Sequence, residues 1–465
     1  MPIFIVAIGN LHEFFTKTSL FLVIFLVLIL ASASLKYICF TYQLNSYELV
    51  VNAGIFLRKH HHIAYNKIQT LHTKQWFYLQ PFSLVSLKIE TSGHADNKAE
   101  AEFPVISQQI VKEIRARCDN LNPALHNKSF LPHTEFVNKT GKSEKHYRIQ
   151  GRELNLYALT SLGFLPLLAG FLAVYNRASD FLPHKVIDSV FKTLAHTGIV
   201  WLIYIGTFTI ILALFISYLI LINRYFHFEI YRKKGQLVTS KGFLQKKIVT
   251  AQIKRIQAVI ISQSFLRQLF GLATIQLMLA SKAAEKESND DLVMFPVIKN
   301  KQASKKTEEF LRWFPKEKLS YTMTGISGSW RMSRNAFLIT LLFVIPLCFF
   351  VRPYGFIALV FLPFSLWLGY YTSKNTGLAL THNNILAVKK TSLLTKRNYL
   401  IPYNKIQSVT IEQSLWMKKA YLSHIKISLR NGNSQQMIKV CYLPTRTVSK
   451  VYHWYCLLQR RPKKE

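Results

Sequence analysis

Long apolar runs interrupt the chain at five places. A helix needs about 20 consecutive, mostly apolar residues to cross the hydrocarbon core of a bilayer. Each run reaches or approaches that length, and none has an aspartate or glutamate in its interior. The pattern therefore predicts five transmembrane helices, at residues 20–40, 156–175, 199–222, 336–351 and 356–371.

The spacing of the apolar runs predicts how these helices are grouped. Only the turn sequence Arg352-Pro353-Tyr354-Gly355 separates the last two runs, so these form a tight helical hairpin. The second and third runs enclose a modest loop and form another hairpin, which leaves the first run as a single helix. Transporters and pumps place ionisable groups at membrane depth. Because the runs hold no acidic residue there, they indicate anchors.

Between the apolar runs, short alternations of apolar and polar residues predict β-strands. Residues 49–51 and 386–388 are examples, and Asn431-Gly432 predicts a hairpin turn in the last segment. Near the end of each polar segment the apolar spacing becomes helical, as at residues 110–114 and 451–458. The predicted unit is an antiparallel sheet of about seven strands closed by one C-terminal helix. At about 80 residues it lies near the lower limit for an independent core.

The polar segments are three copies of one pattern. Placed in register, Ile68, Ile256 and Ile406 align, and a glutamine follows each of them. Such self-similarity indicates a repeated domain. Without a gap, further positions coincide: the glutamines Gln75, Gln263 and Gln413, and the basic pairs Arg58-Lys59, Lys246-Lys247 and Lys396-Arg397. Farther on, each copy has an apolar residue followed by a proline: Pro104, Pro296 and Pro444.

Composition adds an orientation to this picture. The 465 residues carry 59 Lys+Arg against 23 Asp+Glu, a formal net charge of +36, yet 50% of them are apolar. Residues 42–155 carry about +5, residues 223–334 about +13 and the tail from residue 373 about +15. Lysine and arginine accumulate in loops that stay in the cytoplasm. All three copies are therefore predicted on the cytoplasmic side of the membrane, with the N-terminus outside.

The N-terminal helix leaves two interpretations open. Ala31-Ser32-Ala33 has the small-x-small form of a signal-peptidase site, a form that also arises by chance in a helix rich in small residues. Residues 1–8 are apolar too, as expected of the remnant of a missing first helix. The predicted segments are the N-terminal membrane helix at 1–41, domains at 42–118, 223–316 and 373–460, polar linkers at 119–155 and 317–335, and transmembrane hairpins at 156–222 and 336–372.

The threefold arrangement with intervening hairpins, together with the Asn-Lys-Ile-Gln segments, resembles the bacterial type-2 pleckstrin-homology-like (bPH2) domain family, in particular membrane proteins of the YdbT type. The resemblance covers nearly the whole chain. It implies an α+β membrane protein in which three cytoplasmic PH-like β-barrel domains, each of seven strands capped by a helix, are strung between membrane helices. It implies no settled biochemical activity. In the family a helix pair normally precedes the first domain, and here one helix of that pair is absent or truncated.

Basic residues that recur in all three copies are the candidate binding residues for lipid or partner. On domains tethered against an anionic leaflet, each lysine or arginine contributes roughly 1 kcal/mol of attraction. A solvated strand face is the alternative interpretation for any single one of them. The candidates are the three basic pairs and the cation before each shared isoleucine: Arg58, Lys59, Lys67, Lys246, Lys247, Arg255, Lys396, Arg397 and Lys405.

Other candidate chemistry in the sequence is weak. His60-His61-His62 suggests a metal site, but adjacent strand residues point to opposite faces and the other copies lack these histidines. Gly141-Lys142-Ser143 resembles only the end of a phosphate-binding loop. The five cysteines show no metal-binding or disulfide spacing. The sequence thus predicts no enzyme, no metal and no cofactor.

These features predict a non-enzymatic membrane scaffold that binds protein partners, the anionic membrane surface, or both. The alternative is a component of a membrane transport or export/resistance complex, which would need a hydrated path between the helices. Nucleic acid is not expected, because the chain is tethered to a membrane and lacks an interleaved aromatic and basic motif. By resemblance alone, a smaller single-domain family member is a candidate partner, and a homo-oligomer is the other expectation.

Overall fold

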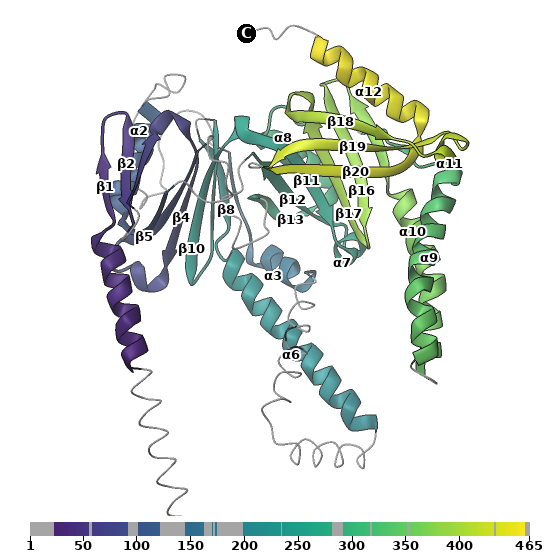
Figure 1. Ribbon diagram of the computed structural model, residues 1–465, viewed down its shortest axis with the longest axis horizontal. Coiled ribbons are helices and arrows are strands. Elements are labelled where there is room, and N and C mark those ends of the chain that lie inside the picture. The colour runs from purple at the N-terminus through teal and green to yellow at the C-terminus, as the bar shows by residue number, and fades with distance from the viewer. Residues whose placement is uncertain are drawn as a thin grey trace, which may run out of the picture.

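A computed structural model shows the protein as a row of β-sheets with long helices projecting from one side (Figure 1). The structure describes residues 23–54, 58–91, 101–120, 145–161, 170, 173, 199–233, 235–280, 292–316, 319–350, 354–431 and 434–460.

The described strands form four open antiparallel sheets, two at the ends of the row and two between the repeats. The first end sheet has the order β1 (Thr41–Leu44), β2 (Glu48–Ala53), β3 (Lys59–Ala64). The last has the order β18 (Ile406–Glu412), β19 (Leu422–Asn431), β20 (Ser434–Pro444).

Each of the two inner sheets has seven strands and is shared between neighbouring repeats. One has the order β6 (Ala101–Ser107), β5 (Leu84–Thr91), β4 (Ile68–Trp76), β10 (Gln245–Gln252), β9 (Gln236–Lys241), β8 (Glu229–Lys233), β7 (His146–Arg148). The other has the order β13 (Leu292–Lys299), β12 (Leu272–Leu279), β11 (Ile256–Gln263), β17 (Thr395–Pro402), β16 (Ile385–Ser392), β15 (Gly377–Thr381), β14 (Thr322–Met323).

This topology corrects the expected barrels, because no sheet closes among the described strands. Each repeat instead packs two open sheets face to face, and its second sheet continues into the first sheet of the next repeat. In the first repeat, Leu49 and Ile63 of one sheet share a core with Leu87 and Phe103 of the other. The inner strand β11 is buried along most of its length, since its two faces serve two cores: Val259 lies in the second and Ile260 in the third.

The shared Ile-Gln step is where the chain passes from one sheet to the other. A three-residue 3-10 helix precedes it in every repeat: η1 (Tyr65–Lys67), η4 (Ile253–Arg255) and η7 (Tyr403–Lys405). The isoleucine that follows is at most 6% exposed in all three repeats. The strand register then shifts across the glutamine, between Ile68 and Thr70 and at the equivalent places in β11 and β18. A bulge of this kind bends a strand, which explains why the motif recurs.

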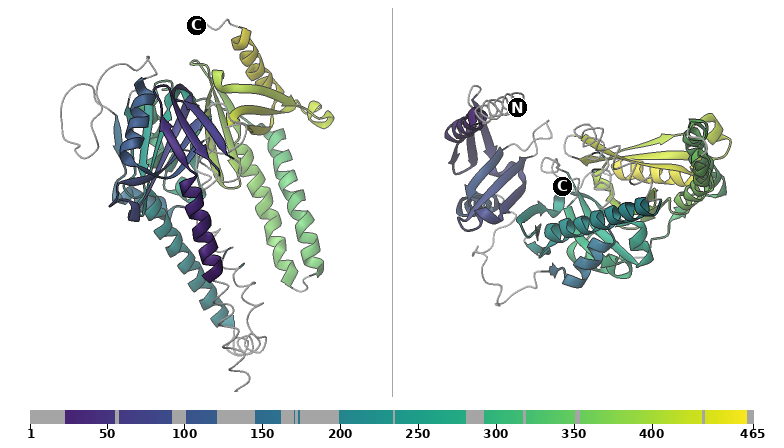
Figure 2. Two further views of the ribbon diagram at one scale, coloured as in Figure 1. Left: turned by 60° about the vertical axis from the view of Figure 1, so that its left-hand side comes forward. Right: turned by 90° about the horizontal axis from the view of Figure 1, so that it is seen from below.

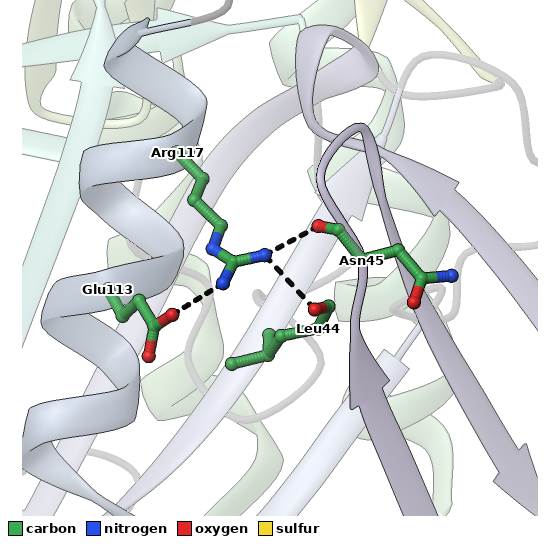
Figure 3. Close-up of polar contacts among 4 residues, drawn as sticks. All are labelled: Leu44, Asn45, Glu113 and Arg117. Atoms are coloured by element: carbon green, nitrogen blue, oxygen red, sulfur yellow. Dashed lines mark hydrogen bonds and ion pairs between the residues drawn. The ribbon is translucent and has the colours of Figure 1, made fainter.

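A C-terminal helix packs beside the second sheet of each repeat, as the helical spacing predicted. These helices are α2 (Gln108–Asn120), α8 (Asn300–Phe310) and α12 (Thr445–Arg460). In the first repeat, Arg117 of α2 reaches the β1–β2 turn, where its Nη1 donates to the carbonyls of Leu44 at 3.0 Å and Asn45 at 2.6 Å (Figure 3). Its Nη2 is 2.6 Å from Glu113 Oε1, so the guanidinium joins the helix to the opposite sheet.

Three described helices are long and apolar enough to cross a membrane: Gly206–Tyr225 within α6 (Ile199–Tyr225), α9 (Ile326–Phe350), and Gly355–Lys374, which takes in most of η6 (Tyr354–Val360) and all of α10 (Phe361–Lys374). The N-terminal run forms a shorter apolar helix, Val23–Ile38. The predicted span at residues 156–175 lies mostly outside the described residues. The described membrane helices leave the β-sheets on the same side, so all three repeats stand at one membrane face (Figures 1 and 2).

Small residues bring α9 and α10 close together. A Cβ atom added at Gly369 would lie 2.4 Å from the Cα of Ser333, and the Ser373 hydroxyl donates to Ser329 Oγ at 2.8 Å. Such residues let membrane helices approach closely and hydrogen bond to each other. The hairpin predicted from the Arg352–Gly355 turn therefore packs as a unit.

Candidate membrane-contact site

The three basic pairs lie where the membrane helices meet the sheets. After α6 the chain runs out along β8 and returns along β9. The turn that follows binds the helix end, because the backbone N–H of Phe243 donates to the carbonyl of Asn223 at 2.9 Å. Lys246 and Lys247 come directly after this turn, at the start of β10. Their position is therefore at the membrane-proximal end of the sheet.

The other two pairs occupy the equivalent place at the starts of β3 and β17. In the third repeat, Lys396 Nζ lies 5.3 Å from the ring centroid of Tyr371, near the end of α10. Burial lowers the pKa of the Lys396 ammonium, and Lys389 has its pKa lowered by burial and then by the charge of Lys396. In the first repeat, Arg58 and Lys59 are exposed. All six residues of the basic pairs thus lie at the membrane-proximal ends of their strands.

The other three candidates, Lys67, Arg255 and Lys405, lie at the opposite end of the strands, in η1, η4 and η7. Lys405 has a structural contact there: its Nζ donates at 2.7 Å to the carbonyl of Lys254 in the preceding repeat. Burial and the nearby Arg255 lower the pKa of Lys405. The structure therefore splits the nine sequence candidates into a membrane-proximal six and a distal three.

The aligned glutamines hold the loop that follows β4, β11 or β18, the strand after the Ile-Gln step in each repeat. Each side-chain Nε2 donates to the backbone carbonyl nine residues later: Gln75 to Leu84 at 3.2 Å, Gln263 to Leu272 at 2.9 Å and Gln413 to Leu422 at 2.8 Å. These bonds close the loops that contain η2 (Phe77–Leu79), α7 (Phe265–Leu269) and α11 (Leu415–Lys418). The gapless sequence register thus reflects one repeated structural role.

The braced loops expose large apolar side chains instead of burying them. Those of the first two repeats lie at the membrane-proximal end, and α11 lies beside the upper end of α9 (Figure 1). Tryptophan and tyrosine are enriched where a protein crosses the membrane–water interface. The exposed residues of these loops and the adjoining turns are Trp76, Phe77, Tyr78, Phe82, Phe243, Leu244, Phe265, Leu269, Phe270, Leu393, Leu415, Trp416 and Tyr421. These side chains and the six residues of the basic pairs are called the rim below.

Hydrogen bonds tie the rim loops to the next repeat and to its membrane helix. The backbone N–H of Phe77 donates to the carbonyl of Leu244, in the turn bound to the end of α6. One repeat later, Gln268 Nε2 in α7 donates to the carbonyl of Leu394 at 2.7 Å, and Gln268 Oε1 accepts from the Tyr371 hydroxyl of α10. The rim loops are therefore held at fixed places beside the membrane helices.

Two further lysines lie at the ends of the membrane helices and were not among the candidates predicted from the sequence. Lys241 Nζ lies 4.6 Å from the ring centroid of Tyr225 at the end of α6, and Lys374 Nζ lies 4.7 Å from that of Tyr370 in α10. Each is a cation–π geometry. Lys374 follows Tyr370 closely at the end of an apolar run, which is a signal that the sequence offers. Lys241 lies two strands after Tyr225 and meets it only through the fold, so no local signal identifies it.

A buried arginine anchors α7 beneath the rim. Arg267 Nη1 donates to Thr274 Oγ1 at 2.6 Å, and its Nε lies 3.4 Å from Thr160 Oγ1 at the end of α3 (Gly151–Leu159). Its guanidinium lies 4.6 Å from the ring centroid of Tyr157. Burial lowers the pKa of Arg267. This residue links the loop to the C-terminal end of α3.

Two other features have local explanations. In the His60–His62 segment, His60 Nδ1 lies 2.7 Å from Asn52 Oδ1 and His62 Nδ1 lies 3.2 Å from Glu48 Oε1, so both engage the neighbouring strand β2. A cavity of 590 Å³ opens beside the start of α3 and is lined by Arg148 among others. Arg148 Nε lies 3.4 Å from Glu229 Oε1, which offsets its charge there. The Gly141-Lys142-Ser143 segment lies outside the described residues.

The geometry is a repeated one, in which a membrane helix leads into strands and a C-terminal helix follows them. The family model described as "Bacterial PH domain" matches residues 3–122, 185–313 and 337–458, most of the chain. The chain belongs to the bacterial PH domain family. The last two matches take in α6 and most of α9, so the family unit includes membrane helix as well as sheet.

The chain is also similar to a known protein over almost its full length. The chain is 27% identical to the "UPF0699 transmembrane protein YdbT" of Bacillus subtilis (strain 168) over 472 residues, covering 98% of this chain and 93% of that protein. Together with its three long apolar helices, this identifies the bacterial PH domain protein described here as an integral membrane protein.

Proposed function

We propose that this bacterial PH domain protein is a non-enzymatic membrane scaffold whose rim holds the three PH-like domains on an anionic membrane surface. The observation that carries the proposal is the position of the basic pairs. All three lie at the membrane-proximal ends of the strands, and exposed aromatic loops lie beside them. The charge pattern of the polar segments supports the cytoplasmic leaflet as that surface, with five membrane crossings.

The physical basis is a division of labour between two kinds of side chain. Each lysine or arginine close to an anionic leaflet contributes roughly 1 kcal/mol. Aromatic rings favour the depth of the headgroups, where one end of the side chain is apolar and the other meets water. Lys246 and Lys247, close to Phe243, provide both contributions within five consecutive residues. The membrane helices supply attachment, so the rim is left to set the orientation of the domains.

The test uses the full chain in lipid vesicles, because neighbouring repeats share sheets. A cysteine replacing Phe243 carries an environment-sensitive fluorophore, and vesicles contain phosphatidylcholine alone or with phosphatidylglycerol. We expect blue-shifted emission and quenching by a lipid-borne quencher, both stronger with the anionic lipid. Adding Lys246→Glu and Lys247→Glu removes that dependence on anionic lipid, since roughly 2 kcal/mol of attraction is lost.

A matched control changes the same charge at the other end of the strands. Lys67→Glu with Lys254→Glu replaces two exposed cations of the distal end. We expect this variant to keep the emission and the lipid dependence of the parent. The proposal is wrong if both double variants behave alike, or if the parent shows no difference between the two lipid mixtures.

A further inference from the structure

The two ends of the row present open strand edges. Among the described strands, β3 pairs only with β2, and β18 pairs only with β19. In the interior, the equivalents of these strands pair on both sides: β10 and β17 take the place of β3, and β4 and β11 take the place of β18. Neighbouring repeats are joined by two such strand pairs, β4 with β10 and β11 with β17, which we call junctions. The strands β18 and β3, at opposite ends of the row, are the two kinds of strand that form a junction.

The two internal junctions have the same register. Lys246 of β10 lies opposite Gln75 of β4, and Lys396 of β17 lies opposite Gln263 of β11. In the alignment of the repeats, these lysines are equivalent to Arg58 and these glutamines to Gln413. A third junction in this register would place Arg58 opposite Gln413 and Lys59 opposite Glu412. The register of the internal junctions therefore predicts which residues of β3 and β18 would face each other.

Residues of β18 are more exposed than their equivalents in β4 and β11, because β18 has a neighbouring strand on one side only. Ile411 is 37% exposed, whereas its equivalents inside the junctions, Thr73 and Ile261, are 6% and 9% exposed. Ser408 is exposed as well, although its equivalents Thr70 and Ala258 are buried. An exposed edge with an apolar residue is a template for another strand.

We propose that β18 of one molecule pairs antiparallel with β3 of a second copy of the same chain, in the register of the internal junctions. This surface continues the established internal interface. Its charges also differ from those of the internal junctions, where Lys74 lies opposite Lys247 and Ser262 opposite Arg397. The new junction sets Lys59 opposite Glu412, a carboxylate that also forms ion pairs with Lys426 and Lys439 of its own sheet. Opposite charges on facing strand residues are stabilising.

The pairing is head-to-tail, because it joins one end of the row to the opposite end of the next copy. A head-to-tail contact leaves one open edge at each end of the assembly, and it closes into a ring or continues as a filament according to its rotation. Viewed from the membrane side, the three repeats follow a bent row (Figure 2). The proposal does not depend on lipid binding by the rim.

The experiment mixes two single-cysteine variants of the full chain in one membrane. Lys59→Cys and Glu412→Cys are expressed together, and a short thiol-reactive cross-linker is added. We expect an adduct of twice the 53.8 kDa monomer mass, containing one copy of each variant, and no such adduct from either variant alone. His60→Cys with Glu412→Cys is the control, because neighbouring strand residues point to opposite faces. The parent chain shows whatever its native cysteines contribute.

A charge exchange gives an independent measurement. In mild detergent, Glu412→Lys is expected to reduce the assembly to monomer mass, and Lys59→Glu combined with Glu412→Lys restores it. A monomeric parent chain, no adduct in the mixed sample, or an adduct of either cysteine with a smaller protein in place of the second copy would overturn the proposal.

Discussion

Lys396 lies directly opposite Gln263 where β17 pairs with β11, and Lys246 has the same relationship to Gln75 one repeat earlier. One residue of each pair starts a strand in the next repeat, and the other braces a rim loop of the preceding repeat. The basic pair and the loop are therefore brought together by the junction between repeats. The three domains form one row in which each junction builds part of the rim.

The loop-bracing glutamines differ in what their loss would cost. Gln263→Ala leaves the carbonyl of Leu272, a residue only 7% exposed, without its side-chain donor. We expect a loss of about 1–3 kcal/mol of stability, the usual cost of an unsatisfied buried polar group. Leu422, the acceptor for Gln413, is only 3% exposed, but Gln413 itself is exposed whereas Gln263 is half-buried. Water can therefore take the place of the Gln413 side chain, and Gln413→Ala has the smaller effect. Thermal unfolding in detergent measures both variants, and equal shifts would contradict this account of the loop.

Substitutions at Arg267 can show whether its packing or its hydrogen bonds contribute more to stability. In the gapless register its equivalent in the third repeat is Met417, which is 6% exposed. Replacing a buried charge by an apolar residue of similar volume is often neutral, whereas truncation leaves a cavity. We expect Arg267→Met to keep most of the melting temperature and Arg267→Ala to lower it clearly. If both variants are equally damaged, the hydrogen bonds to Thr274 and Thr160 matter more than the packing.

The hairpin of α9 and α10 depends on Gly369. A Cβ atom there meets backbone atoms of Ser333 at 2.4 Å and 2.8 Å, which cannot move aside cheaply. We expect Gly369→Val to separate the helices and to lower the resistance of the chain to heat and protease. Gly206→Val in α6 is the matched control, because nothing lies within 4 Å of the added Cβ. The same loss in both variants would argue against close packing at Gly369.

His424 makes the third repeat sensitive to acid. The backbone N–H of Tyr442 donates to His424 Nδ1 at 3.0 Å, which requires an unprotonated nitrogen. Burial, and then the charge of Lys439, lower the pKa of His424 from its ordinary 6.5, while Glu412 acts in the opposite direction. As the pH falls below about 6.5, the unfolded chain binds a proton that the folded chain does not, so stability decreases.

The measurement for His424 is the melting temperature between about pH 5 and pH 8, the range that brackets an ordinary histidine pKa. His424→Asn keeps an acceptor for the Tyr442 N–H but does not titrate. We expect this variant to melt with a weaker pH dependence than the parent over the acidic half of the range. An unchanged slope would assign the acid sensitivity to other groups.

Much of the molecule was predictable because its signals are local. Apolar run length identified the membrane helices that the structure describes, and the aligned Ile256 and Gln263 identified the repeat and a shared structural role. Strands β19 and β20 pair on either side of the predicted hairpin turn, and α12 follows Pro444, as the patterns indicated. Each of these depends on residues close together in the sequence.

Strand partners were not predictable in the same way. Alternation shows which face of a strand is buried, but it does not name the neighbour at its edge. The sharing of sheets between repeats was therefore missed, and closed barrels were expected in its place. The short strands β7 and β14 fell in segments expected to be linkers, because two or three residues, such as Thr322 and Met323, carry no periodic signal.

The shared sheets are the central feature of this account, and a cross-link within one chain tests them most directly. Lys74 and Lys247 face each other across the junction of β4 with β10. In the full chain carrying Lys74→Cys and Lys247→Cys, a short thiol cross-linker should yield one tryptic species that joins the two strands. The pair Lys74→Cys with Lys246→Cys should give far less, because residue 246 points to the other face. Repeats that fold as separate closed barrels would give no cross-linked peptide with either pair.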